Sequence, residues 1–315
     1  MSELPYSGPI IDSHIHLWDL SGGAYPWLEP TGSFGPAGML DNLKGKDYLL
    51  DDYRRDIAGQ GVVASVHIEA LWDDGISKVN ETKWLETLDK SDNLAIRYVV
   101  GVPFGVPETE SLLREQAAIA RTKAVRQVIA WTPYPDRTMV FEPEIARGEE
   151  WRKALPIMVE LGLSLEILMY PWQAEQVAEL AELYPALPII IDHIGSPIEQ
   201  TPEGLKMWSD GLATMAAHPN VVIKVSSAAG YLTEPSVEGL KGLSDQVIAA
   251  FGTDRVMIGS DFPVGALGGW SYAEYFDAYR YCLQGFTVDE QYAMFCGNAA
   301  RVYEIPVAEI IASGS

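Results

Sequence analysis

The sequence predicts a single-domain (β/α)8 barrel, the TIM-barrel fold class, and three observations lead to that prediction. Eight short apolar runs, rich in β-branched residues, recur along the 315 residues. Segments with apolar residues at three- and four-residue spacing lie between these runs, as expected for helices that connect parallel strands. No linker, low-complexity tract or sequence repeat marks a second domain. Eight such units favour closure into a barrel, with an open doubly wound sheet as the alternative.

The expected strands are nearly continuous apolar segments, as is usual when both faces of a parallel sheet are covered. They comprise residues 10–15, 62–68, 96–102, 124–131, 164–169, 188–192, 221–225 and 256–260. The expected helices include residues 78–90, 108–122, 149–161, 172–184 and 236–251.

Two segments depart from this alternation. Residues 20–46 contain several glycines and prolines and are expected to form an extended first loop. In a barrel, loops that follow strands shape the mouth of the active site. Residues 288–303 are expected to form a final helix that packs across the barrel.

The overall charge excludes some classes of partner. Asp and Glu number 44 against 22 Lys and Arg, which gives a net charge of -22. This charge disfavours nucleic acid and anionic membrane surfaces and leaves a small molecule as the expected partner. No apolar run approaches the roughly 18 residues of a membrane span. The two cysteines lack the spacing of a metal site or disulfide scaffold, so a reduced, cytoplasmic protein is expected.

Four residues that can carry chemistry come at the ends of expected strands. His14 and His16 are two residues apart on the first strand and therefore point to the same face. His193 follows the sixth strand in the sequence DHIG, and Asp261 follows the eighth in GSDFP. Imidazoles so placed can bind Zn²⁺ or donate hydrogen bonds to a developing oxyanion. A carboxylate there can bind metal or act as a general base.

These motifs resemble those of the amidohydrolase superfamily, specifically its amidohydrolase-2 family. The HxH, DHxG and GSDxP motifs are most similar to those of the lactonase branch, which includes L-fuconolactonase-like and 2-pyrone-4,6-dicarboxylate-lactonase-like enzymes. Supporting segments lie at residues 25–28, 81–85, 125–131 and 297–303. The resemblance implies hydrolysis of a small cyclic ester, commonly a sugar-acid lactone, with the three histidines and the aspartate in the site.

Other positions limit the cofactor and keep alternatives open. The fourth strand offers no lysine that could bridge two metals, so at most one divalent ion, such as Zn²⁺, is expected, and a metal-independent enzyme is the alternative. Decarboxylases of the superfamily resemble one another in carrying a histidine on the fifth strand, and this sequence has none there. Its absence disfavours a decarboxylase. A metal-dependent decarboxylase and a non-catalytic binding barrel remain as alternative functions. The particular lactone and the number of subunits stay open.

The expected roles follow the chemistry of ester hydrolysis. Asp261 is expected to take the proton from the attacking water, while His14 and His16 polarise the carbonyl through a metal or directly. His193 is expected to complete the metal shell or to orient the carbonyl. The further residues expected to contact substrate lie at strand ends or in the first loop: Arg126, Trp27, Glu69, Tyr170, Lys224 and Phe262. For Glu69, Lys224 and His67, a buried polar network is an equally good interpretation.

Overall fold

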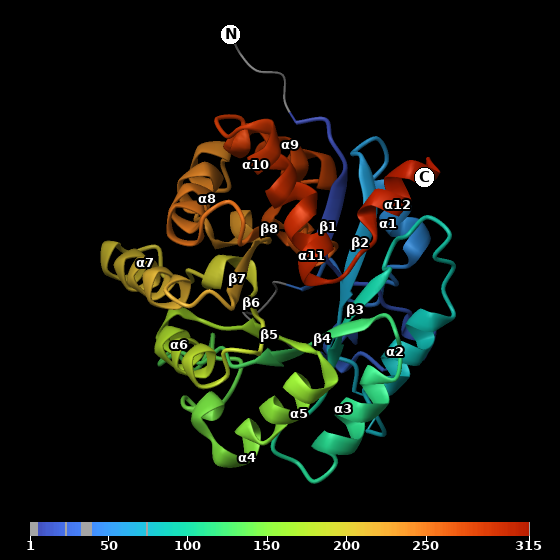
Figure 1. The fold of residues 1–315 in the computed structure, drawn as a ribbon, viewed down its shortest axis with the longest axis vertical. Helices are drawn as coiled ribbons and strands as arrows, with labels where there is room; N and C mark the ends of the chain where they lie inside the picture. The colour runs from blue at the N-terminus through green and yellow to red at the C-terminus, as the bar shows by residue number, and fades with distance from the viewer. Residues whose placement is uncertain (1–5, 23, 33–39, 74, 315) are drawn as a thin grey trace.

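The chain folds as a (β/α)8 barrel in a computed structural model that describes residues 6–22, 24–32, 40–73 and 75–314. Eight parallel strands follow one another around a single sheet in chain order (Figure 1). Their bounds are β1 Ile10–Ile15, β2 Val62–Ile68, β3 Arg97–Gly101, β4 Thr122–Val128, β5 Ser164–Leu168, β6 Ile189–Ile191, β7 Val221–Val225 and β8 Val256–Ile258. The expected barrel of eight parallel strands is confirmed.

Most strand bounds differ from the predicted ones by two residues or fewer, and the largest difference is at β4. β4 begins at Thr122 and ends at Val128, whereas residues 124–131 were the predicted strand. The helix predicted over residues 108–122 ends as α3 at Ala117. The Thr122 N–H donates to the Ile119 carbonyl at 2.9 Å, so a tight turn separates helix and strand.

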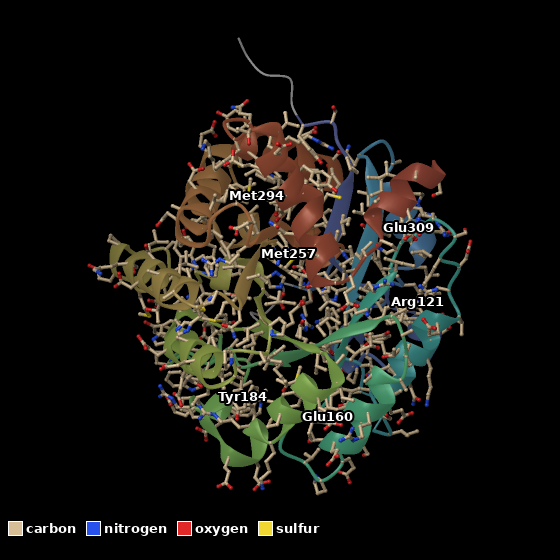
Figure 2. All side chains as sticks on the ribbon, in the orientation of Figure 1. Arg121, Glu160, Tyr184, Met257, Met294 and Glu309 are labelled. Atoms are coloured by element: carbon tan, nitrogen blue, oxygen red, sulfur yellow. The ribbon has the colours of Figure 1, made fainter. Side chains whose placement is uncertain are left out.

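Helices surround the barrel (Figures 1 and 2). Those that follow the strands or pack between them are α1 Leu50–Asp56, α2 Val79–Glu86, α3 Thr109–Ala117, α4 Glu149–Arg152, α5 Ala154–Leu161, α6 Ala174–Leu183, α7 Pro202–Ala216, α8 Val237–Phe251 and α9 Tyr272–Leu283. The starts of α7, α8 and α9 are fixed by Thr201, Ser236 and Ser271, whose side chains accept a backbone N–H of the first turn. No helix of the described ranges is long and apolar enough to cross a membrane.

The C-terminal segment is less regular than expected. Residues 288–303 were predicted as one helix, but they form α10 Val288–Tyr292, a π-helical turn Ala293–Gly297 and α11 Asn298–Val302. A last helix, α12, spans Val307–Ser313. Because the π turn takes one more residue per hydrogen bond than an α-helix, it interrupts the helical register. The segment packs against alternate residues of the strands, with Tyr303 fully buried among them.

The predicted first loop begins with two short 3-10 turns, Leu20–Gly22 and Pro26–Leu28. Residues 23 and 33–39 of the predicted 20–46 loop lie outside the described residues.

Backbone hydrogen bonds join the first strand to the segment after the last. The His16 N–H donates to the Phe262 carbonyl and the Asp261 N–H donates to the His14 carbonyl, each at 2.8 Å. The pairing of β1 with β2 shifts register between Asp12 and Ile15. Such an irregularity re-aims the side chains that follow it. The two ends of the barrel therefore meet where the predicted site residues lie.

The buried carboxylate of Asp12 reinforces this junction. It accepts the Ser260 N–H at 2.8 Å and the hydroxyls of Tyr272 and Tyr53 at 2.9 and 3.0 Å. Full burial raises the pKa of Asp12, and these donors offset part of that rise. One side chain of β1 thus ties α1, α9 and the β8 end together.

Candidate active site

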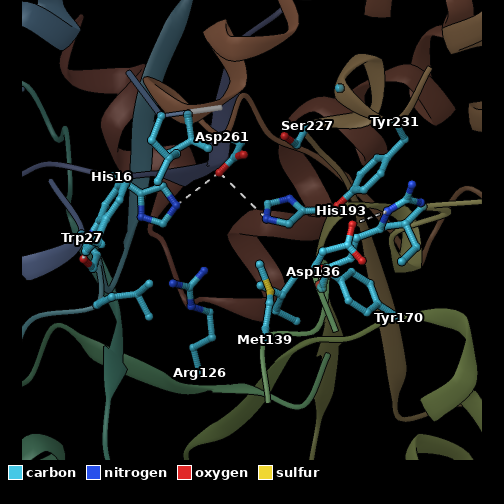
Figure 3. Close-up of a pocket in the computed structure, with 18 residues that line it drawn as sticks. His16, Trp27, Arg126, Asp136, Met139, Tyr170, His193, Ser227, Tyr231 and Asp261 are labelled. Carbon is cyan, nitrogen blue, oxygen red and sulfur yellow. Dashed lines mark hydrogen bonds and ion pairs between the residues drawn. The ribbon is translucent and has the colours of Figure 1, made fainter. Parts of the chain in front are cut away.

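The structure brings together the four residues that the sequence motifs single out. Asp261 Oδ1 lies 3.2 Å from His16 Nε2, 3.4 Å from His14 Nε2 and 3.9 Å from His193 Nε2. Figure 3 shows His16 and His193 on either side of the Asp261 carboxylate. All four side chains are buried. Three imidazole nitrogens therefore converge on one carboxylate oxygen.

Two of the imidazoles are fixed by hydrogen bonds at their other nitrogen. His16 Nδ1 lies 2.9 Å from the Ile68 carbonyl, which only accepts, so Nδ1 carries the proton in the neutral ring. His16 Nε2 then presents a lone pair toward Asp261. His193 Nδ1 lies 2.9 Å from Ser226 Oγ, a hydroxyl that can donate or accept. This is the arrangement by which proteins orient metal-binding histidines.

His14 is held from below by charged groups. Its Nδ1 lies 3.3 Å from Asp192 Oδ1 and 3.3 Å from Lys224 Nζ. Burial, and then the charge of Lys224, lower the pKa of His14 well below its usual value. Burial also lowers the pKa of His193, to about 4, although Asp261 opposes that shift. Both rings are therefore neutral at pH 7, the form that binds metal.

For the pKa of Asp261, neighbouring groups outweigh burial, whereas burial dominates for His14 and His193. Burial alone would raise its pKa, but His193 and His16, together with a hydrogen bond from Ser227, outweigh it. The pKa of Asp261 consequently lies below its usual value, and the group is a carboxylate at neutral pH. A carboxylate facing neutral imidazoles can bind a cation or accept a proton.

The donor set fits a metal ion. The ligand atoms of His14, His16 and Asp261 all lie within 4.8 Å of one another, and those of His14, Asp192 and His193 do so as well. Imidazole nitrogens and one carboxylate are the ligands of hydrolytic metal sites. His14 belongs to both groups, because its Nδ1 faces Asp192 and its Nε2 faces Asp261. The group of His14, His16 and Asp261 is the better candidate for the metal site, since His16 and Asp261 line the cavity.

Left-handed backbone conformations gather around this group. His193, Ile194, Ser227 and Asp261 have φ angles of 50°, 56°, 53° and 62°. Such conformations cost about 1 to 3 kcal/mol each in non-glycine residues and persist where the surrounding structure imposes them. At Gly259 a Cβ atom would lie 2.9 Å from the His14 Cβ, so this position of the GSDFP motif needs glycine.

A cavity of about 460 Å³ opens above the four residues. His16, His193 and Asp261 line its floor, while His14 is fully buried beneath. Three of the predicted substrate-binding residues also line it: Trp27, Arg126 and Tyr170 (Figure 3). The volume suits a small organic molecule.

Arg126 is positioned by a predicted residue that does not itself line the cavity. Glu69 Oε1 lies 2.8 Å from Arg126 Nε and 2.7 Å from Nη2, and the Glu69 carbonyl accepts from Nη2 at 2.8 Å. Burial would raise the pKa of Glu69, but the guanidinium lowers it to about 2. Arg126 Nη1 has no hydrogen-bond partner within the described part of the chain. Glu69 therefore belongs to a buried network and leaves one Arg126 donor for a ligand.

Lys224 and Phe262 lie away from the described cavity lining. Lys224 is fully buried, and its Nζ donates to Glu166 Oε1 at 2.5 Å. Phe262 packs edge-on against Tyr272, with ring centroids 5.2 Å apart. For Lys224 the buried-network interpretation fits the geometry, and Phe262 is part of the core.

His67 is likewise buried, with Nε2 3.3 Å from the Leu17 carbonyl. Burial lowers its pKa to about 3.

Several residues at the site were not singled out by the sequence. Asp192 and Glu166 interrupt apolar strand segments, and a charge in such a segment is a signal of an interior position. Asp136, Ser227 and Tyr231 line the cavity from loops after β4 and β7. Loop residues carry no periodicity, so no sequence pattern could have found these three.

The fold and the site together define an amidohydrolase. A family model described as amidohydrolase matches residues 11–305, and the chain belongs to this family.

More particular relatives share nearly the whole chain. An uncharacterised protein of Sinorhizobium fredii is 33% identical over 299 residues, which cover 94% of this chain and 98% of the relative. An L-fucono-1,5-lactonase of Burkholderia multivorans is 27% identical over 311 residues, which cover 94% and 96% of the two chains. A crystal structure of an amidohydrolase from Burkholderia multivorans with bound zinc has a TM-score of 0.78 at 22% identity and covers 95% of this chain and 100% of its own. The last similarity concerns the fold.

Proposed function

We propose that this protein is a hydrolase that opens a small cyclic ester. The observation that carries the proposal is the Asp261 carboxylate facing three imidazole Nε2 atoms at the floor of a cavity. This arrangement supplies a proton acceptor and a site for carbonyl polarisation at one point. The similarity to L-fucono-1,5-lactonases over 94% of the chain supports a lactone as the ester.

A single divalent ion, with zinc as the first candidate, fits the site. His14 and His16 would hold it through their Nε2 atoms, which form a ligand group with Asp261. His193, whose Nε2 lies 3.9 Å from the same Asp261 oxygen, is the further expected ligand. When bound, such an ion polarises an ester carbonyl as a Lewis acid. The contact of His16 Nδ1 with the Ile68 carbonyl orients the ring so that Nε2 points toward this position.

The protein's own groups then perform the proton transfers. Asp261 accepts a proton from water as the water oxygen bonds to the ester carbon. The ring C–O bond breaks, and Asp261 returns the proton to the departing alkoxide. Arg126 Nη1 is free to donate to a substrate oxygen, which orients the ring against Asp261. Because the ester is cyclic, ring opening gives a single product, a hydroxy acid.

The test is a screen of lactones with a pH indicator, run on protein whose metal content is measured by elemental analysis. We expect acid release that matches ring opening one to one, together with at most one tightly held divalent ion per chain. Release of CO2 from an aromatic acid, without acid release from any lactone, would replace this proposal with a decarboxylase. Two ions per chain would contradict the single-metal site.

A further inference from the structure

The cavity above the proposed catalytic group has mainly apolar walls. Its floor carries His16, His193 and Asp261, and higher up aliphatic side chains and aromatic rings outnumber the polar side chains of Arg126, Asp136, Arg137 and Ser227. The larger aliphatic ones come from the first loop, from the end of β5 and from the segments after β2, β4, β6 and β8: Leu40, Leu71, Met139, Leu168, Ile198 and Val264. Aliphatic walls exclude water from whatever part of the ligand they contact.

The aromatic residues of the wall direct their donors into the protein. The Tyr170 hydroxyl donates to the Arg137 carbonyl at 3.0 Å, and the Tyr231 hydroxyl donates to Ser196 Oγ at 3.0 Å. The Trp27 indole N–H donates at 2.8 Å to the carbonyl two residues after β2. These rings consequently present mainly carbon to the cavity. A ligand rich in hydroxyl groups would find few donors on this wall.

The cations of the described lining each have a nearby carboxylate. Arg126 is paired with Glu69 at 2.7 Å, and Arg137 Nε lies 3.9 Å from Asp136 Oδ2. Asp261 adds a further negative charge at the floor, and the whole chain carries a net charge of -22. A substrate with two carboxylates would meet no surplus of guanidinium charge here.

We propose that the substrate is a lactone that carries an apolar alkyl or aryl substituent and few free hydroxyl groups. The ester group lies on the floor beside Asp261, and the substituent extends between Met139, Leu168 and Ile198. This inference rests on the proposed ring-opening function and narrows it. It separates the protein both from lactonases of polyhydroxylated sugar acids and from hydrolases of dicarboxylate lactones.

The physical basis is the different cost of burying carbon and oxygen. Each methylene removed from water strengthens binding about fourfold. Each hydroxyl buried without a partner weakens binding by about fivefold to more than a hundredfold. An apolar wall therefore discriminates strongly between lactones of equal size.

The first experiment compares substrates on the metal-containing protein. The series is δ-valerolactone and its ethyl, n-butyl and n-hexyl derivatives, tested beside glucono-1,5-lactone, L-fucono-1,5-lactone and 2-pyrone-4,6-dicarboxylate. We expect kcat/KM to rise about fourfold per methylene until the cavity is filled. A higher kcat/KM for a sugar lactone or for the dicarboxylate than for the n-butyl compound would overturn the inference.

A matched pair of variants tests the wall itself. Met139→Gln keeps the length of the side chain but places an amide in the wall, whereas Met139→Leu keeps it apolar. We expect Met139→Gln to lower the ratio of n-butyl to glucono activity about tenfold and Met139→Leu to change it less than threefold. Val288→Ala, at an exposed position of α10, serves as the control. An unchanged ratio in Met139→Gln would contradict an apolar contact at this place.

Binding of lactams separates failure of this inference from failure of the proposed function. The lactam matching the n-butyl lactone keeps the ring and the substituent but resists hydrolysis. Calorimetry should give a Kd at least tenfold lower for this lactam than for a polyhydroxylated lactam of equal ring size. Tight alkyl-lactam binding without turnover of any lactone would refute the ester hydrolase and retain the apolar site. Preference for the hydroxylated lactam would refute the apolar site.

Discussion

The barrel contains two groups of buried polar residues, one above the other, and they differ in what they face. The open cluster consists of His14, His16, His193 and Asp261, and all of these except His14 line the cavity. The closed cluster is fully buried and consists of Lys224, Glu166, Asp192 and Tyr303. Both consist of titratable side chains, and all but Tyr303, which follows α11, come from strands or from the residues just after them. Titratable groups are thus placed in very different surroundings.

The closed cluster neutralises itself, whereas the open cluster does not. Lys224 Nζ donates to Glu166 Oε1 at 2.5 Å and lies 3.6 Å from Asp192. Tyr303 donates to the second Glu166 oxygen at 2.7 Å. Burial, and then Asp192, raise the pKa of Glu166 to about 8, so this group keeps a proton near neutral pH. Asp261, in contrast, is a carboxylate at the cavity floor. Access to the cavity thus distinguishes the carboxylate of Asp261 from the carboxyl group of Glu166.

The largest expected effect is on turnover by the open cluster. Asp261→Asn keeps the volume of the side chain but removes its ability to accept a proton from water. We expect kcat to fall by at least two orders of magnitude, since general-base catalysis contributes about 10² to 10⁴-fold. The melting temperature should change little.

Glu166→Gln is the matched change in the closed cluster. It should retain at least about a tenth of the wild-type kcat, because Glu166 does not border the cavity. If Asp261→Asn kept most of its turnover on a confirmed lactone, Asp261 would be structural and the proposed roles would be wrong.

The second prediction concerns stability. Lys224→Met leaves Glu166 and Asp192 without their cation, and breaking a buried pair costs about 3 to 5 kcal/mol of unfolding free energy. Urea unfolding measures this loss. Lys241→Met removes a partly exposed pair with Asp245 and should cost less than about 1 kcal/mol.

Metal content separates the two clusters in the same samples. Lys224→Met protein that remains folded should keep its single ion, whereas His16→Ala should lose most of it. Equal stability of Lys224→Met and Lys241→Met would show that the closed cluster contributes little to the fold.

The smallest effect extends the comparison to Glu81, a buried carboxyl of α2. Burial, and then Glu69, raise its pKa from 4.5 to about 8, with Lys78 and Arg126 opposing the shift. A pKa raised on folding means that the folded state holds the proton more tightly. The stability from this group is complete below pH 4.5 and is lost as the pH rises through about 8.

Glu81→Gln cannot lose that proton, and its amide oxygen can still accept the Ala70 N–H. The variant's melting temperature relative to wild type should therefore increase from pH 5 to pH 8.5. A constant difference over this range would mean that Glu81 is not protonated in the folded protein.

The strands and the open cluster were predictable because each depends on local pattern. Apolar runs located the eight strands to within about three residues, since a strand covered on both faces needs little information from elsewhere. His14 and His16 share a face through the two-residue repeat of a strand. His193 and Asp261 follow strand ends, and the ends of parallel strands meet at one side of a barrel.

The same pattern did not show which of the expected substrate-binding residues line the cavity. Arg126 and Lys224 are both basic residues within strands, yet only Arg126 lines the described cavity. Trp27 reaches the cavity from a loop, whereas Phe262, directly after Asp261, packs into the core. How deep a side chain lies in the barrel depends on the stagger of neighbouring strands, which is a property of the closed sheet.

The sequence by itself therefore determined the barrel, the four residues of the open cluster and the acidic character of the chain. Only the tertiary structure decided which charged residues face the cavity, which neutralise one another, and that the cavity walls are mainly apolar. The physical reason is that strand periodicity sets the direction of a side chain, whereas its partners come from segments far away in the chain. Lys224 and Glu166 are 58 residues apart and become a pair only when the barrel closes.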